Sequence, residues 1–177
     1  MSDGRISALI KALKKISGED SLEDQPEVIN KSVNVEERKT LEVLFVPSHD
    51  IENPVRDAHE SWYTPETIVK AQVSYEANKE SVPSNLFHME ETEAFTVEET
   101  FILEEDTVYE SGVEVAKGTM LGWIKYEDEE LWEIKKSNSL GGMSPAFYGT
   151  TNKETGEITN IGFTLEDHHK LVEESDA

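Results

Sequence analysis

The clearest pattern of hydrophobic and polar positions lies in residues 95–103, where the two kinds alternate. Phe95, Val97, Phe101 and Leu103 fall on one side, and Thr96, Glu98, Thr100 and Ile102 fall on the other. A period of two is typical of an antiparallel strand with one buried face. Residues 41–46, stopped by Pro47, and residues 119–126 predict two more strands. The last segment is apolar on both sides, so we expect it in the centre of the sheet.

Shorter segments predict further strands joined by tight turns. Residues 31–35 can pair with the next strand through a turn at residues 36–39. Nearer the C-terminus we expect a strand that begins around Ser144, then a turn at residues 152–156 and a strand at residues 158–164. Strands joined by such short connections pair in an antiparallel manner.

Two helices are predicted from their end signals. Thr64 can cap a helix in which Pro65 suits the first turn, and the helix is expected to run to about residue 79. Its buried side is expected to carry Ile68, Ala71, Val73 and Tyr75. A short helix after Asp128 has acidic residues in its first turn and basic residues in its last, as the helix dipole favours. It is expected to pack through Leu131, Trp132 and Ile134.

The two ends of the chain differ from this central part. Residues 1–18 predict an amphipathic helix, interpreted either as a basic tether for a partner helix or an anionic surface, or as a helix packed on its own domain. Residues 19–30 are acidic and predict a flexible linker. We expect one globular domain at residues 31–165, followed by an acidic tail at residues 166–177 that forms a helix or a strand before it frays.

Charge restricts the classes of partner. The chain of 177 residues carries 38 acidic and 16 basic side chains, which gives a formal net charge of −22. A surface of this sign repels phosphates, so we expect no nucleic acid and no membrane as partner. The absence of cysteine excludes disulfides, thiolate catalysis and cysteine-based metal sites. Without a membrane-spanning run or a secretory signal pattern, the protein is expected to be soluble and unexported.

Candidate chemistry is concentrated in residues 140–149, where Gly141 and Gly142 precede the hydroxyl of Ser144. The glycines allow the chain to turn tightly before it extends. A serine hydroxyl becomes a nucleophile only when an imidazole within hydrogen-bond reach takes its proton. The best candidate for that imidazole is His88, which precedes the long alternating strand.

The residue pattern by itself favours no metal-binding or catalytic site at the other histidines. His49 and the Asp57-Ala58-His59 segment lie where no periodicity is present, and we interpret them as loop residues. His168 and His169 are adjacent, so their side chains diverge on a helix and alternate on a strand. No His-Glu-x-x-His pattern accompanies them. We therefore expect no metal and no other cofactor.

The order of these features resembles a known family. The residues that carry the resemblance are the strand at 41–46 with Pro47, Asp57-Ala58-His59, Thr64-Pro65-Glu66, His88 before a strand, Gly118-Thr119 before a tryptophan-containing strand, and Gly142-Met143-Ser144. Together they resemble the XkdF-like serine proteases of tailed phages, relatives of the phage prohead (capsid maturation) proteases, which share their fold with herpesvirus assemblins. The resemblance covers roughly residues 31–162, and its strength lies in the ordered set, because each piece alone is weak.

The resemblance implies an α+β protein built as an antiparallel β-barrel flanked by helices. It implies a serine endopeptidase of capsid maturation that works within the assembling procapsid in the host cytoplasm. Its partners would be the phage scaffold and major capsid proteins, whose extensions it would cut. Because herpesvirus relatives are activated by dimerisation, the resemblance also implies a homodimer or a larger oligomer as an option.

Carried over residue by residue, the resemblance implies Ser144 as the nucleophile and His88 as the general base of an acyl-enzyme mechanism. The wider group adds a histidine or an acid downstream of the serine, and residues 166–169 occupy that region here. We predict His169 or Asp167 as this third group, and the sequence does not choose between them.

Pro145, directly after Ser144, departs from the family pattern, and because it has no N–H it cannot help to form an oxyanion hole. An alternative hypothesis is therefore a catalytically inactive protease-fold protein that acts as a scaffold or capsid-binding assembly component. It predicts a separation between Ser144 and His88 too wide for proton transfer. A third hypothesis rests on net charge alone: an acidic decoy that mimics nucleic acid and binds a basic protein in a salt-sensitive complex.

Overall fold

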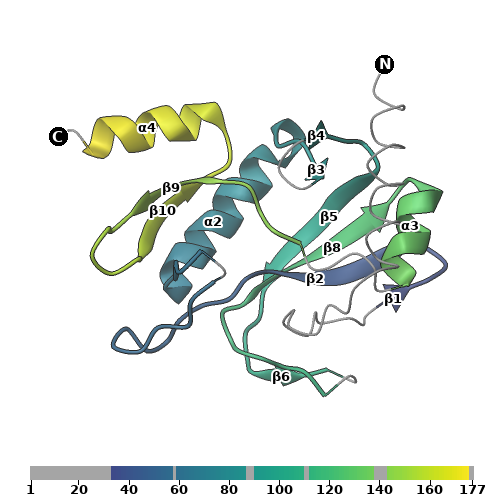
Figure 1. Ribbon diagram of the computed structural model, residues 1–177, viewed down its shortest axis with the longest axis horizontal. Helices are drawn as coiled ribbons and strands as arrows, with labels where there is room; N and C mark the ends of the chain where they lie inside the picture. Colours follow the sequence, from purple (N-terminus) through teal and green to yellow (C-terminus); the bar gives the residue numbers. More distant parts are fainter. Residues whose placement is uncertain (1–32, 58, 87–89, 110–111, 138–142, 176–177) are drawn as a thin grey trace, which may run out of the picture.

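The computed structural model describes most of the chain after the N-terminal segment and shows a mixed α+β structure with antiparallel sheets (Figure 1). The residues that it describes are 33–57, 59–86, 90–109, 112–137 and 143–175. The predicted N-terminal helix at residues 1–18 and the predicted linker at residues 19–30 lie outside them.

A four-stranded antiparallel sheet in the order β1-β2-β8-β5 forms the centre of the molecule. Its strands are β1 (Val33–Asn34), β2 (Lys39–Phe45), β8 (Met120–Tyr126) and β5 (Phe95–Ile102). Strand β8 pairs with β2 on one side and with β5 on the other, which confirms the central position predicted for the segment that is apolar on both sides. The predicted pairing before the turn at residues 36–39 is confirmed as the short β1–β2 ladder.

The predicted alternation of β5 is interrupted within the strand. Its register against β8 shifts between Val97 and Glu99, as at a β-bulge. Beyond the shift the buried position is Thr100, which the pattern placed on the polar side and which is 5% exposed. The face assignment was therefore wrong for the C-terminal half of the strand, because one extra residue exchanges the two faces.

Helix α2 (Pro65–Asn78) begins as predicted. The Thr64 side chain accepts a hydrogen bond from the Thr67 backbone N–H, and Pro65 stands in the first turn. Ile68 and Ala71 are fully buried, but Val73 is 61% exposed, so its predicted place on the buried side was wrong. Five residues after Ile68, a side chain has rotated too far around the helix to share its face. A 3₁₀ turn (Lys79–Ser81) follows the helix.

The remaining described elements are short. Each of three two-stranded antiparallel sheets stands apart from the central sheet: β3 (Asn85–Leu86) with β4 (Glu90–Glu91), β6 (Thr107–Val108) with β7 (Glu114–Val115), and β9 (Tyr148–Thr151) with β10 (Ile158–Gly162). Helix α3 (Glu129–Lys136) follows β8, and α4 (Leu165–Ser175) follows β10. The predicted hairpin around residues 152–156 and the helix after Asp128 are thereby confirmed.

The described strands do not close into the expected β-barrel. At one edge, β1 covers only the first two residues of β2. At the other edge, side chains of α2 take the place of a further strand, because Gln72 donates to the Thr100 carbonyl at 3.2 Å and Glu76 accepts from the Thr100 N–H at 3.0 Å. The helix thereby satisfies the backbone N–H and C=O of Thr100, which are then not available to a further strand.

Buried apolar residues form two separate clusters on the central sheet. One cluster joins β2 and β8 to α2 and β10, and its buried members are Phe45, Tyr63, Ile68, Ala71, Met120, Ile158, Ile161 and Phe163. The other joins β5 and β8 to α3, and its buried members are Ala94, Phe95, Ile124, Tyr126, Leu131 and Trp132. The two helices therefore press on different parts of the sheet and leave a space between them.

A buried ion pair fixes α3 to the sheet. The Lys135 Nζ lies 2.8 Å from the Glu42 Oε1, and both side chains are 1% exposed. Neither carboxylate oxygen of Glu42 has a hydrogen-bond partner of good geometry, so the attraction to the lysine is its main compensation for lost hydration. Nearby, burial raises the pKa of Tyr126, whose hydroxyl lies 3.4 Å from the Thr40 hydroxyl.

Removal of one charge of this pair should destabilise the fold strongly. The substitution Glu42→Gln removes the carboxylate charge beside the buried Lys135 ammonium group, so we expect a loss of about 3–5 kcal/mol in the free energy of unfolding. This is a large fraction of the stability of an ordinary domain. Urea denaturation followed by tryptophan fluorescence measures it.

The matched control is Glu133→Gln, which removes the same charge from an exposed pair with Lys136 and should cost less than about 0.5 kcal/mol. The double variant Glu42→Leu with Lys135→Met should recover most of the loss, because no charge stays buried. Equal, small effects of Glu42→Gln and Glu133→Gln would contradict this account.

Candidate functional site

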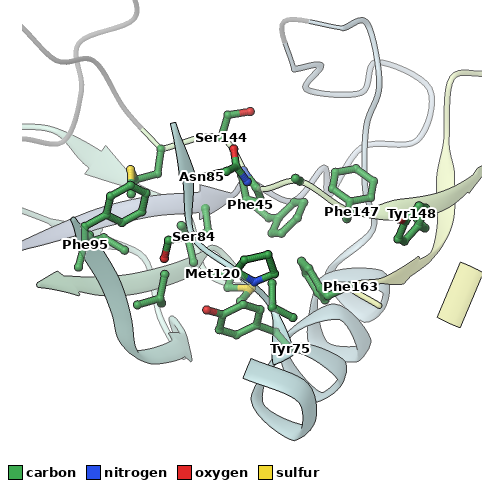
Figure 2. Close-up of a pocket in the computed structure, with 18 of the residues that line it drawn as sticks. Phe45, Tyr75, Ser84, Asn85, Phe95, Met120, Ser144, Phe147, Tyr148 and Phe163 are labelled. Atoms are coloured by element: carbon green, nitrogen blue, oxygen red, sulfur yellow. The ribbon is translucent and has the colours of Figure 1, made fainter. Parts of the chain in front are cut away.

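A groove of about 680 Å³ lies over the central sheet, between the two apolar clusters (Figure 2). Leu44, Val97, Met120 and Ile124 from β2, β5 and β8 form its floor. One wall is the segment 82–85 after α2, and the other is the segment 143–148 before β9. A Cβ at Gly122 would lie 2.9 Å from Leu44 Cδ1, so the glycine allows that side chain to lie across the floor.

The backbone holds both walls in place. The Thr92 N–H donates to the Ser84 carbonyl at 2.9 Å, and the β3–β4 pairing continues from there. The opposite wall passes directly into β9, which is paired with β10. Both walls are extended segments, a shape that suits an extended ligand between them.

Aromatic side chains line the end of the groove next to α2. The ring of Phe45 lies 5.5 Å from that of Phe147, and the ring of Tyr75 lies 5.2 Å from that of Phe163 in an edge-on arrangement. Figure 2 shows these side chains gathered around the same cavity. Burial, and then the neighbouring Glu76 charge, raises the pKa of Tyr75 to about 12, so its hydroxyl is neutral at ordinary pH.

Ser144, the predicted nucleophile, lies on the rim of this groove and is exposed. It belongs to the extended segment before β9 rather than to a strand, since β9 begins at Tyr148 and not near Ser144 as expected. In Figure 2 its hydroxyl points away from the rings of Phe45 and Phe147.

His88, the predicted general base, lies outside the described residues. Its described neighbours are informative, because Ser84 and Asn85 line the wall that faces Ser144. The segment that leads to His88 and the segment that carries Ser144 thus border the same groove. The predicted pairing of His88 with Ser144 requires these segments to meet, and it stays a prediction because His88 is outside the described residues.

His59 also lines the groove, although the sequence analysis treated it as a loop residue. Asp57 builds the turn that carries it: one carboxylate oxygen accepts from the backbone N–H groups of His59 and Ser61, and the other accepts from the Tyr63 hydroxyl at 2.6 Å. The aspartate therefore supports the backbone here. An Asp followed by such a polar turn was the available signal for an ordered loop.

Asp167, one of the two candidates for the third group, caps α4. Its Oδ2 accepts hydrogen bonds from the backbone N–H groups of Phe163 and Thr164 and from the Thr164 hydroxyl, which in turn accepts from the Asp167 N–H. This is a reciprocal capping box. Gly162 packs so closely on Asp167 that a Cβ at the glycine would overlap it.

These contacts determine the ionisation of Asp167. Burial raises its pKa, but the hydrogen bonds from Thr164 and from the backbone N–H groups outweigh burial and lower the pKa below the ordinary value of 3.8. The carboxylate is therefore charged at neutral pH and is already held by donors of its own helix.

His169, the other candidate, is exposed on α4, and neither it nor Asp167 is among the described residues that line the groove. The neighbouring His168 lies closer to the groove wall, because its ring stacks on that of Tyr148 at 4.7 Å. The structure thus brings Ser144, His59 and Tyr148 to one cavity.

Among the described residues, no group of three or more acidic or histidine side chains could hold a metal ion. In the same part of the chain, no helix has the length and apolar character needed to span a membrane. Comparison of the chain with protein-family models, with curated proteins and with solved structures finds no match. The candidate site is therefore judged on its own geometry.

The role of Asp167 can be tested by acid stability. A group whose pKa is lowered by folding stabilises the protein above the unfolded-state value, and this contribution is lost as the pH falls through the folded-state pKa. Asp167→Ala should cost about 1 kcal/mol at pH 7, and the cost should decrease as the pH falls below the ordinary aspartate pKa of 3.8. Urea denaturation at a series of pH values measures both.

Thr164→Ala is the matched variant, because it breaks the same capping box from the other side. If capping is the role of Asp167, the two substitutions together should cost little more than one alone. Additive losses, or an Asp167→Ala protein with unchanged stability at pH 7, would refute the capping role.

Proposed function

We propose that the chain is a serine endopeptidase that binds an extended peptide in the groove and cleaves it with Ser144. The observation that carries the proposal is the common groove: Ser144 stands on its rim, and the opposite wall leads into the segment that holds His88. An extended groove beside a hydroxyl is the arrangement that peptide cleavage requires.

The proposed chemistry is acyl transfer. The Ser144 hydroxyl attacks the peptide carbonyl while the imidazole of His88 takes its proton, which it then gives to the departing amine. Water, activated by the same imidazole, releases the acyl group. Backbone N–H groups near Ser144 would stabilise the oxyanion, with Pro145 excluded because it lacks an N–H.

The proposed context is capsid maturation in a tailed phage, within the assembling procapsid in the host cytoplasm. The substrates would be extensions of the scaffold and major capsid proteins, and the fold would be that of the prohead proteases. This part rests on the ordered motifs of the XkdF-like family, with the central antiparallel sheet and α2 as its structural counterpart. A homodimer or larger oligomer belongs to the same proposal.

A second candidate function is a protease-fold protein that binds capsid or scaffold protein without cutting it. Two observations favour it. The Ser144 hydroxyl points away from the aromatic end of the groove, and the Asp167 carboxylate is engaged in capping α4. In this version the groove binds a peptide and Ser144 performs no chemistry.

Cleavage distinguishes the two candidates. Co-expression of the wild-type chain with the capsid and scaffold proteins encoded beside it should produce shortened partners, detected by intact mass. Ser144→Ala should reduce cleavage by at least about a thousandfold, because the nucleophile is lost. The variant should fold normally, since the side chain is exposed.

Ser81→Ala is the control, because Ser81 is an exposed serine that is not among the described groove residues and should not affect the rate beyond a few-fold. His88→Ala and His59→Ala then identify the base: loss of cleavage in His88→Ala alone supports the proposal. If Ser144→Ala protein still cleaves its partners, Ser144 is not the nucleophile. If the partners stay full-length when co-expressed with the wild type, only the second candidate, binding without cleavage, remains.

A further inference from the structure

We propose that the groove selects an extended, uncharged peptide segment with one large apolar or aromatic side chain next to the bond beside Ser144. The proposal rests on the proposed function and names its substrate class. Acidic residues on either side of the segment would be disfavoured, and basic residues would be tolerated there.

The chemistry of the lining supports this class of ligand. Among the described residues that border the groove, none is Asp, Glu, Lys or Arg, although 31% of the chain is charged. A charged side chain that entered would lose part of its hydration and would meet no Asp, Glu, Lys or Arg among these described residues. An apolar side chain loses no such interaction and removes apolar surface from water.

The volume of the groove suits several residues of peptide. At about 680 Å³ it falls within the range of sites that enclose a ligand of moderate size. The aromatic end offers ring edges and faces of Phe45, Phe147 and Phe163, each of which already packs edge-on with a tyrosine ring of the protein. A Phe or Leu side chain can make the same kind of contact.

Polar atoms at the walls can hold the peptide backbone. The side chains of Ser84 and Asn85 border the groove on one wall, and the Tyr75 hydroxyl lies at the aromatic end. Burial keeps that hydroxyl neutral, so it can donate to a carbonyl or accept from an N–H. Such contacts align a backbone without restricting its sequence, and the apolar floor supplies the selectivity.

Charge complementarity determines which residues of the ligand are favoured on either side of its apolar segment. The chain has a formal net charge of −22, and the described lining of the groove contains no Asp, Glu, Lys or Arg. Outside the groove, an acidic residue of the ligand would meet repulsion that salt screens only in part. A basic residue would be attracted, so the favoured ligand is apolar in the middle and neutral or basic at its ends.

The test uses Ser144→Ala protein and fluorescein-labelled octapeptides that differ at one central position. That position is Phe, Leu, Ala, Lys or Glu, the rest of the peptide is uncharged, and binding is measured by fluorescence polarisation. We expect the Phe and Leu peptides to bind at least tenfold more tightly than the Lys and Glu peptides. Equal affinities, or no binding of any peptide at millimolar concentration, would overturn the proposal.

A groove-filling variant locates the binding. Ala146 is exposed and borders the groove, so Ala146→Trp should fill part of it and weaken the Phe peptide at least tenfold. Val73→Trp is the control, because Val73 is 61% exposed and is not among the described groove residues. Equal effects of the two variants on affinity would also overturn the proposal.

Cleavage of the same peptides by the wild-type chain tests the endopeptidase proposal separately from the proposed selectivity. If the Phe peptide is bound but not cleaved, the endopeptidase proposal is wrong and the proposed selectivity of the groove stands. If peptides are cleaved beside Lys or Glu at the same rate as beside Phe, the endopeptidase proposal stands and the proposed selectivity is wrong.

Discussion

The arrangement of the molecule depends on the buried contact between Lys135 and Glu42. A lysine and a glutamate that are both withdrawn from water must stay together, since each alone would be a buried charge without compensation. This requirement fixes the last turn of α3 against β2, and the chain that leaves α3 is the chain that returns at Met143 to form one wall of the groove. The other wall depends on α2, which is held at the β5 edge by Gln72 and Glu76. The groove thus lies over a sheet to which both helices are fixed by polar contacts.

The proposed function depends on the residues that line the groove and on the serine at its rim. A floor of apolar strand residues and two extended walls provide a place for a peptide, and Ser144 provides a hydroxyl at its edge. In this proposal the uncharged lining selects the middle of the peptide, and the acidic residues of the chain act on its ends. A site without a deep pocket can select a peptide segment in this way. The binding and cleaving versions of the proposal share this geometry. They differ only in whether an imidazole reaches the serine, which makes the choice between them a chemical question rather than a question of fold.

Much of the fold could be predicted from local patterns. The two-sided apolar segment around Ile124 became the central strand, and the Thr64-Pro65 and Asp128 signals marked true helix starts, because strand burial and capping are decided within a few residues.

Long-range effects were missed. Lys135 looked like an exposed charge at a helix end, and its burial depends on Glu42, far away in the sequence. The expected barrel failed because side chains of α2, rather than a strand, satisfy the β5 edge. At the site, Ser144 and the segment before His88 do border one groove, whereas Asp167 proved to be a helix cap, a role that its spacing from Thr164 already indicated.

The most direct test of the central claim is covalent labelling of the wild-type chain with an alkyl fluorophosphonate, followed by intact mass and peptide mapping. An activated serine at the groove predicts a single adduct on Ser144, formed more slowly when a Phe-containing octapeptide is present and absent in His88→Ala protein. A chain that stays unlabelled at Ser144, or that is labelled there equally with and without His88, would contradict the claim that this groove is the active site of a serine hydrolase.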